Sequence, residues 1–267
     1  MGCLRMIQLS RRLQQIADQI PAGSRVADIG SDHALLPAYL IERSIASQCI
    51  AGEVNQGPYK AAKKQVAMAG LSSHIQVRLG NGLTVIQAGE ADVITIAGMG
   101  GHLICTILES GLNQLRGVQR MILQPNVGED AVRRWLHAHE WFLEDEFIIH
   151  EDGKIYEVLV ASPLQNSGMN EEAAYDKLER FEKLYEARIM TDVLLTTDLL
   201  YRMGPYLLDE ASDVFQLKWK GEIAKLVWIM DQQKQSESED AKQKLSMMLQ
   251  HKKQLEEVLA CLPKVKP

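Results

Sequence analysis

Val26-Ala27-Asp28-Ile29-Gly30-Ser31-Asp32-His33-Ala34 decides the fold of this chain, and one short helical segment later comes Ile50-Ala51-Gly52-Glu53. The first stretch has the pattern of a buried strand, a glycine turn and a helix start, and the second that of a strand ending in a carboxylate. On a parallel sheet this is the framework of a site for a nucleotide-like ligand. A dinucleotide does not fit, because only Gly30 stands where a pyrophosphate loop needs G-x-G-x-x-G.

The charges around this turn further limit the class of ligand that can bind there. Asp28 and Asp32 would repel a pyrophosphate, whereas they suit a ligand that carries a ribose and a positive charge. S-adenosylmethionine has both, together with an amino-acid tail. The sequence therefore predicts S-adenosylmethionine as the cofactor and argues against a nicotinamide oxidoreductase.

Composition limits the class of protein. The chain has 267 residues and is 46% hydrophobic, which allows one large domain or a medium domain with an appendage. Its apolar runs are too short to span a bilayer. The cysteines Cys3, Cys49, Cys105 and Cys261 form no C-x-x-C pair, which favours a cytoplasmic protein without a metal or disulfide framework. A net charge of −6 argues against nucleic-acid binding by bulk charge and leaves room for a local basic face.

Strand and helix patterns alternate along the first part of the chain. The spacing predicts strands at 25–29, 47–53, 75–79, 92–96 and 119–123 and helices at 9–20, 35–42, 58–68, 102–109 and 129–139. Two more strands, 142–150 and 154–161, are joined by an Asp-Gly turn, a strong hairpin signal. The pattern is typical of an α/β class I methyltransferase sheet, Rossmann-like, with seven strands of which the last is antiparallel.

The pattern changes at the turn-rich stretch 162–170. We expect a cofactor-binding methyltransferase domain over 1–165 and an all-α, coiled-coil-like domain over 166–267, in which 231–244 connects two long antiparallel helices. Lys218, Trp219, Lys220, Lys252 and Lys253 are candidates for gripping an RNA backbone, and solvated helix faces are the alternative. A monomer is expected, with weak dimerisation of this arm as the alternative.

The candidate cofactor residues follow the first four strands. Glu53 is expected to accept hydrogen bonds from two ribose hydroxyls, and Asn81 to read the adenine edge. The alternatives are a turn that merely closes a βα unit, a solvated strand-end carboxylate and an Asn-Gly turn chosen for its backbone. The predicted set is Asp28, Gly30, Ser31, Asp32, His33, Glu53, Val54, Asn81, Gly82, Ala97, Gly98, Met99 and Gly100.

The acceptor side is predicted from the ends of the fourth and fifth strands. The three glycines of 97–101 leave room for a flat base, and the amides of Gln124 and Asn126 are suited to hold one, although a plain Pro-Asn turn is the alternative. The Asn/Asp-Pro-Pro-aromatic tetrad of many exocyclic amino-methyltransferases is absent. Candidate catalytic residues are Asp32, His33, Met99, Gln124 and Asn126.

The ordered motifs V-A-D-I-G-S-D-H-A, A-G-E-V-N-x-G-P-Y, V-R-L-G-N-G-L, I-A-G-M-G-G, L-Q-P-N and E-D-G-K-I-Y-E-V resemble the bacterial TrmK family of tRNA adenine N1-methyltransferases. The resemblance covers roughly residues 9–162, and the tail is similar to the family's C-terminal arm. It implies methylation of N1 of adenine 22 of tRNA. The chain departs from the family pattern at Leu35, where a Tyr is usual, and at Asn81, where an Asp is usual.

Two other functions use the same cofactor framework. One is a methyltransferase for another RNA or a small-molecule acceptor. The other is a non-enzymatic adaptor with a degenerate methyltransferase domain, which predicts no cofactor binding. For the tRNA enzyme, adenine N1 already carries a lone pair, so catalysis is expected to come mainly from positioning, and Asp32 is suited to stabilise the cationic product.

Overall fold

The computed structural model describes residues 7–165, 170–233 and 239–262. The chain divides into two compact units, of which the first ends at Lys183 and the second begins at Leu184. This division differs from the expected boundary at 165, because the helix α6 (Glu171–Leu184) is anchored to unit 1. Residues 166–169 of the expected boundary stretch lie outside the described residues.

Two hydrogen bonds attach α6 to the sheet of unit 1. The buried Lys177 ammonium donates to Ser162 Oγ (2.7 Å) and to the Pro163 carbonyl (2.6 Å). The same ammonium lies 5.6 Å from the centre of the Phe142 ring. Turn-forming residues in the sequence marked the end of the last strand, but they gave no signal for this contact.

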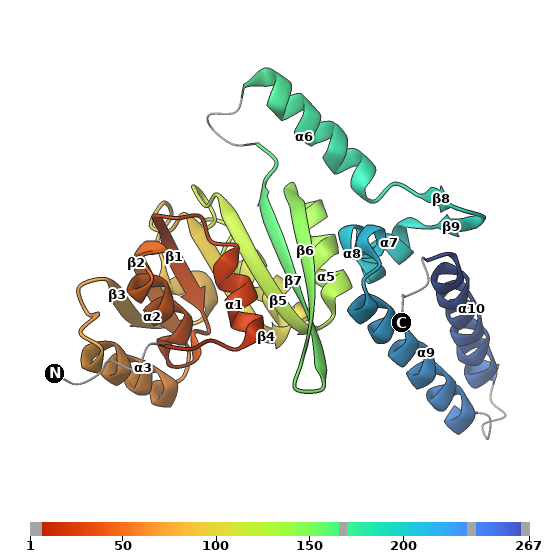
Figure 1. Cartoon of the computed structure of the whole chain (residues 1–267), viewed down its shortest axis with the longest axis horizontal. Coiled ribbons are helices and arrows are strands. Elements are labelled where there is room, and N and C mark those ends of the chain that lie inside the picture. Colours follow the sequence, from red (N-terminus) through yellow and green to blue (C-terminus); the bar gives the residue numbers. More distant parts are fainter. Residues whose placement is uncertain (1–6, 166–169, 234–238, 263–267) are drawn as a thin grey trace. The chain divides into compact units, whose positions relative to one another are not determined.

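Unit 1 contains a seven-stranded sheet of order β3-β2-β1-β4-β5-β7-β6 (Figure 1). β1 to β5 pair in parallel, while β7 is antiparallel to both β5 and β6, which confirms the predicted methyltransferase topology. From β1 the sheet grows in one direction through β2 and β3, and from β4 it grows in the other direction through β5. Ligands bind at such a switch point, beyond the carboxyl ends of the strands. The strands are β1 (Ser24–Ile29), β2 (Ala46–Glu53), β3 (Ile75–Leu79), β4 (Val93–Gly100), β5 (Arg120–Val127), β6 (Trp141–Glu151) and β7 (Lys154–Pro163).

The helices of unit 1 pack apolar residues against the sheet. Side chains of α1, α2 and α3 share one hydrophobic core with β1, β2 and β3, with Ile16, Leu40 and Val66 among the buried members. Ser10 caps α1 by accepting from the Leu13 N–H at 3.2 Å, so this helix starts later than the sequence pattern suggested. The helices are α1 (Arg11–Asp18), α2 (Leu35–Glu42), α3 (Gln56–Met68), α4 (Gly101–Ser110) and α5 (Glu129–Ala138).

The stretches 97–101 and 124–126 were expected to form loops after the fourth and fifth strands. Residues 97–100 and 124–126 instead extend β4 and β5, which pair with each other there. Ala97 pairs with Gln124 and Met99 with Pro125, with register shifts around Met99. Proline has no N–H to donate, so an irregular pairing is expected at this point. The Pro-Asn turn that was the alternative at 124–126 is therefore not formed, and Gln124 and Asn126 are residues of β5.

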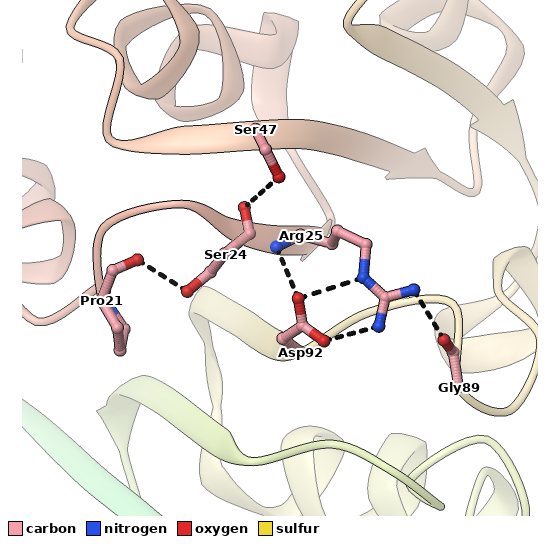
Figure 2. A network of polar contacts seen from close by, with 6 residues as sticks. All are labelled: Pro21, Ser24, Arg25, Ser47, Gly89 and Asp92. Atoms are coloured by element: carbon pink, nitrogen blue, oxygen red, sulfur yellow. Dashed lines mark hydrogen bonds and ion pairs between the residues drawn. The ribbon is translucent and has the colours of Figure 1, made fainter.

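The amino-terminal ends of β1 and β4 are linked by an ion pair between Arg25 and Asp92 (Figure 2). The Arg25 guanidinium donates to both Asp92 oxygens, at 3.1 and 2.5 Å, and the Arg25 N–H donates to Asp92 at 2.9 Å. Arg25 also donates to the Gly89 carbonyl at 2.9 Å. These bonds fix the start of β1 against β4, so that both strands end at the same edge.

Unit 2 contains a small hairpin as well as helices. β8 (Arg188–Met190) and β9 (Val193–Leu195) pair antiparallel, so the part of the chain that was expected to be all-α also contains two short strands. The remaining elements are α7 (Thr197–Met203), α8 (Pro205–Glu210), α9 (Asp213–Gln233) and α10 (Glu239–Cys261). The connection expected at 231–244 is largely helical at its ends, and 234–238 lie outside the described residues.

The long helices α9 and α10 lie side by side (Figure 1). Phe215 and Trp219 on α9 and Leu255 and Val258 on α10 are buried. Within the described part of the chain, no helix is long and apolar enough to cross a membrane. Cys49, Cys105 and Cys261 are free thiols, and Cys3 lies outside the described residues.

Candidate functional site

The turn after β1 is built by the buried Asp28 carboxylate. One oxygen accepts from Ser31 Oγ and the other from Thr95 Oγ1, both at 2.6 Å, and only 5% of Asp28 is exposed. Burial raises the pKa of Asp28, and the two hydroxyl donors oppose this rise. Both carboxylate oxygens therefore already have protein partners, so Asp28 holds the turn against β4.

Gly30 and the residues after it adopt a left-handed backbone. Gly30 has φ of 74°, and a Cβ there would lie 2.2 Å from Met99 Cε. Asp32, His33 and Ala34 follow with φ of 30°, 62° and 55°, which are rare for residues with side chains and concentrate at functional sites. The strained turn places the Asp32 side chain, 85% exposed, and the half-exposed His33 side chain at the sheet edge, 3.5 Å apart.

Glu53 is a buried carboxylate at the end of β2. Only 6% of the residue is exposed, and its Oε1 has no hydrogen-bond partner. Burial raises the pKa of Glu53, and the negative charge of Asp32 raises it further. A buried oxygen without a donor is costly, so this arrangement calls for a ligand with hydroxyl groups.

A pocket of about 150 Å³ opens beside this carboxylate. Gly52 and Val54, the neighbours of Glu53, line it, as does the exposed Asn81. A Cβ on Gly80 would lie 2.9 Å from Val85, and one on Gly82 would lie 3.0 Å from Ile107, so neither position has room for a side chain. The full lining is Ile29, Gly30, Gly52, Val54, Gly80, Asn81, Gly82, Met99, Leu103 and Ile107.

Gln124 and Asn126 on β5 hold the end of β4. The fully buried Gln124 accepts from the Gly98 N–H at 3.1 Å, and Asn126 Nδ2 donates to the Gly98 carbonyl at 2.8 Å. Gln124 Nε2 donates to the Pro125 carbonyl at 2.8 Å. The Gln124 amide is thus engaged by protein groups, and its place in the site is to position Gly98.

A larger pocket of about 680 Å³ lies next to the smaller one. The two share Gly30 and Met99, so their contents are neighbours. Of the predicted residues, Asp32, Ala97, Gly98 and Asn126 also line the larger pocket. Asp28, Ser31, His33, Glu53, Gly100 and Gln124 line neither pocket directly. The full lining is Arg12, Gly30, Asp32, Ala97, Gly98, Met99, Asn126, Lys154, Ile155 and Tyr156.

Sequence reasoning missed Arg12, Lys154 and Tyr156. Arg12 comes from α1, and Nη1 donates to Gln124 Oε1 at 2.6 Å. Lys154 and Tyr156 are among the first residues of β7, directly after the Asp-Gly turn of the hairpin. The hairpin signal located these two residues in the chain, but nothing local indicated that they face the end of β4.

The candidate RNA-contacting residues of unit 2 have mixed surroundings. Trp219 is buried, whereas Lys220 is exposed. Lys252 pairs with Glu256 at 2.6 Å and Lys253 with Glu257 at 3.6 Å, both along α10. Lys218 lies 5.6 Å from the centre of the Trp219 ring. Trp228 has 64% of its surface exposed, and sequence reasoning did not single it out.

The site fits S-adenosylmethionine on its own geometry. The partnerless Glu53 oxygen matches a ribose, and the glycine-lined pocket beside it matches a flat base. Among the described residues, no group of three or more His, Cys, Asp or Glu side chains is arranged to hold a metal ion. Comparison with known proteins agrees with this fit.

The family model for TrmK, tRNA (adenine(22)-N(1))-methyltransferase, matches residues 26–256. The tRNA (adenine(22)-N(1))-methyltransferase of Bacillus subtilis is 44% identical over 95% of this chain and 98% of its own length. The crystal structure of B. subtilis TrmK superposes with a TM-score of 0.80 at 43% identity, over 95% of this chain and 99% of that one. A Streptococcus pneumoniae protein in complex with S-adenosyl-L-methionine is 36% identical, with a TM-score of 0.75, over 94% of this chain and 100% of that one. The chain therefore belongs to the TrmK family of tRNA (adenine(22)-N(1))-methyltransferases.

Proposed function

We propose that this chain transfers a methyl group from S-adenosylmethionine to N1 of adenine 22 of tRNA. The observation that carries the proposal is the pair of adjoining pockets, which meet at Gly30 and Met99. One is flanked by a buried carboxylate that suits a ribose, and the other is large enough for an extruded base. Membership of the TrmK family supports the acceptor and its position.

The smaller pocket and the turn beside it would hold the cofactor. Glu53 would accept the ribose hydroxyls, and Asn81 would meet the adenine edge with its amide. Asp28 acts indirectly, by fixing the turn through Ser31 and Thr95. When bound, S-adenosylmethionine supplies an electrophilic methyl group on a sulfonium centre.

The protein's part in the reaction is mainly positional. Neutral adenine N1 has a lone pair, so no side chain has to remove a proton from it before attack. Gln124 and Asn126 fix the Gly98 peptide, which lines the larger pocket beside Met99, and holding reactants in line contributes up to roughly 7–11 kcal/mol in favourable cases. The methylated ring is a cation, and the exposed Asp32 carboxylate lines the pocket in which that charge develops.

The helical part of the chain is proposed to hold the body of the tRNA. Lys220 is exposed on α9, and Lys253 is 77% exposed on α10, so both are accessible to phosphates. The exposed Trp228 adds a surface on which a base can stack. This assignment concerns residues 184–267, the unit that the structure separates from the sheet.

A methylation assay on transcribed tRNA tests the proposal. Wild-type protein with labelled S-adenosylmethionine should modify a tRNA carrying adenine 22, and primer extension should stop at that nucleotide. The same tRNA with guanine at position 22 should accept no label. Cofactor binding without tRNA methylation would favour a different acceptor, and failure to bind S-adenosylhomocysteine in calorimetry would favour an adaptor.

A further inference from the structure

Two planar side chains from distant parts of the sequence meet in the larger pocket. The Arg12 guanidinium carbon lies 5.5 Å from the centre of the Tyr156 ring, within the range of a cation–π contact. Arg12 belongs to α1 and Tyr156 to β7, and both line the pocket beside Gly98 and Met99. Tyr156 has no part in the cofactor site described above, and Arg12 is connected to it only through its hydrogen bond to Gln124.

Arg12 is held in place from two directions. Its Nη1 donates to Gln124 Oε1 at 2.6 Å, and its backbone N–H donates to Glu151 Oε2 at 3.2 Å. Glu151 Oε1 accepts from the Arg11 N–H at 2.6 Å, so this carboxylate at the hairpin caps the first turn of α1. The hairpin therefore fixes the helix, the helix fixes Arg12, and Arg12 lies over Tyr156 before any substrate arrives.

We propose that the target base stacks on the Tyr156 ring and that Arg12 is the positioning residue that holds this ring. The inference rests on the proposed function, because it assigns the acceptor subsite of the same reaction. A base in this pocket lies next to the cofactor, since Gly30 and Met99 form a common wall. An aromatic ring suits this task because every base has a π-face.

The pocket also fits an extruded nucleotide in its size and charge. Its volume of about 680 Å³ lies within the roughly 300–1,000 Å³ usual for small-ligand sites. Lys154, exposed at the hairpin, lines the same pocket and gives it a positive side toward the RNA backbone. Removing a base from its stack costs a few kcal/mol, and a fixed ring that restacks the base offsets this cost.

The test uses full-length protein and compares an aliphatic replacement of the ring with an aromatic one. Tyr156→Leu removes the π-face, and Tyr156→Phe keeps it. The matched control is Tyr39→Leu, because the Arg43 guanidinium lies 5.5 Å from the centre of the Tyr39 ring, as Arg12 does from Tyr156, yet Tyr39 lines neither pocket. Arg12→Lys keeps the charge of Arg12 and removes its planar fork.

Three measurements are made on each variant: calorimetry with S-adenosylhomocysteine, steady-state methylation of tRNA, and fluorescence of tRNA with 2-aminopurine at position 22. We expect Tyr156→Leu to bind S-adenosylhomocysteine as wild type does and to lose roughly 5- to 150-fold in kcat/KM, the effect of removing one base–aromatic stack. Its 2-aminopurine complex should be brighter, because no ring quenches the extruded base. Tyr156→Phe and Tyr39→Leu should behave as wild type.

Arg12→Lys separates positioning from stacking. It should lower kcat/KM more in the presence of Tyr156 than in the Tyr156→Leu background, because the part of its effect that acts through the ring is lost there and only the part that acts through Gln124 remains. Equal kcat/KM and equal fluorescence for Tyr156→Leu and wild type would overturn the inference. So would a loss in kcat/KM that grows at low salt and disappears at high salt, because that indicates a phosphate contact in place of stacking. Absence of methylation by the wild-type protein would instead refute the proposed function.

Discussion

Glu53→Gln is expected to weaken cofactor binding while stabilising the free protein. Wild-type Glu53 keeps a nearly buried carboxylate whose Oε1 has no donor, beside a pocket that suits a ribose. Glutamine has the same shape, but it has no charge and presents one amide nitrogen in place of an oxygen. The substitution therefore removes a ligand contact and also removes the burial cost of a charge.

The size of the binding effect follows from the lost hydrogen bond. A hydrogen bond to a charged acceptor contributes about 1.5–3 kcal/mol, and at least one of the two expected from the ribose is lost. The dissociation constant of S-adenosylhomocysteine should rise by roughly 10- to 150-fold. Isothermal titration calorimetry at neutral pH measures it.

The stability effect has a defined dependence on pH. Burial raises the pKa of Glu53 from its ordinary value of 4.5, so the folded state holds this proton more tightly than the unfolded chain does. The contribution of Glu53 to stability is therefore present below pH 4.5 and is lost as pH rises through the raised pKa. Glu53→Gln should unfold at a higher urea concentration than wild type at neutral pH, and this difference should shrink on acidification toward pH 4.5.

Glu90→Gln is the matched control with the opposite sign. The Arg78 guanidinium donates to both Glu90 oxygens, at 2.7 and 2.6 Å, and lowers the pKa of Glu90. This contribution is present above pH 4.5 and is lost as pH falls through the lowered pKa, so Glu90→Gln should destabilise the protein at neutral pH and leave cofactor affinity unchanged. Wild-type affinity in Glu53→Gln, or reduced stability of that variant at neutral pH, would refute the reasoning.

Three further outcomes are expected. Arg133→Met should lower the free energy of unfolding by about 3–5 kcal/mol, because the fully buried Arg133 guanidinium is ion-paired with two buried carboxylates. A loss below about 1 kcal/mol in urea unfolding would contradict this. Gly30→Ala should weaken S-adenosylhomocysteine binding with little change in circular dichroism. The alanine would have to adopt the left-handed φ of Gly30, which costs about 1–3 kcal/mol, and its Cβ would collide with Met99. Unchanged affinity in calorimetry would count against the close contact. Deleting 184–267 should spare cofactor binding and abolish tRNA methylation in the labelled assay, and full methylation by the shortened protein would exclude the helical unit as the tRNA-holding part.

The sequence predicted those parts of the site that depend on local chain chemistry. A glycine with positive φ is needed directly after β1, and Gly30 occupies that position. The carboxylate at the end of β2 and the Asn-Gly step after β3 were located from strand patterns alone, and both lie beside the small pocket. The hairpin of β6 and β7 was predicted from its Asp-Gly turn. The hairpin of β8 and β9 was missed, because its strands are only three residues long and lie within an apparently helical pattern.

The sequence by itself determined the order of strands and helices as far as β7, the glycine turn and the acidic residue that ends the second strand, because these depend on neighbouring residues and on side-chain periodicity. Only the tertiary structure decided that Gln124 positions Gly98 and that Arg12 and Tyr156 line the larger pocket. The Arg12–Gln124 hydrogen bond joins residues 112 positions apart. Such a contact exists only after α1 and β5 have packed together, and no local pattern of residues encodes it.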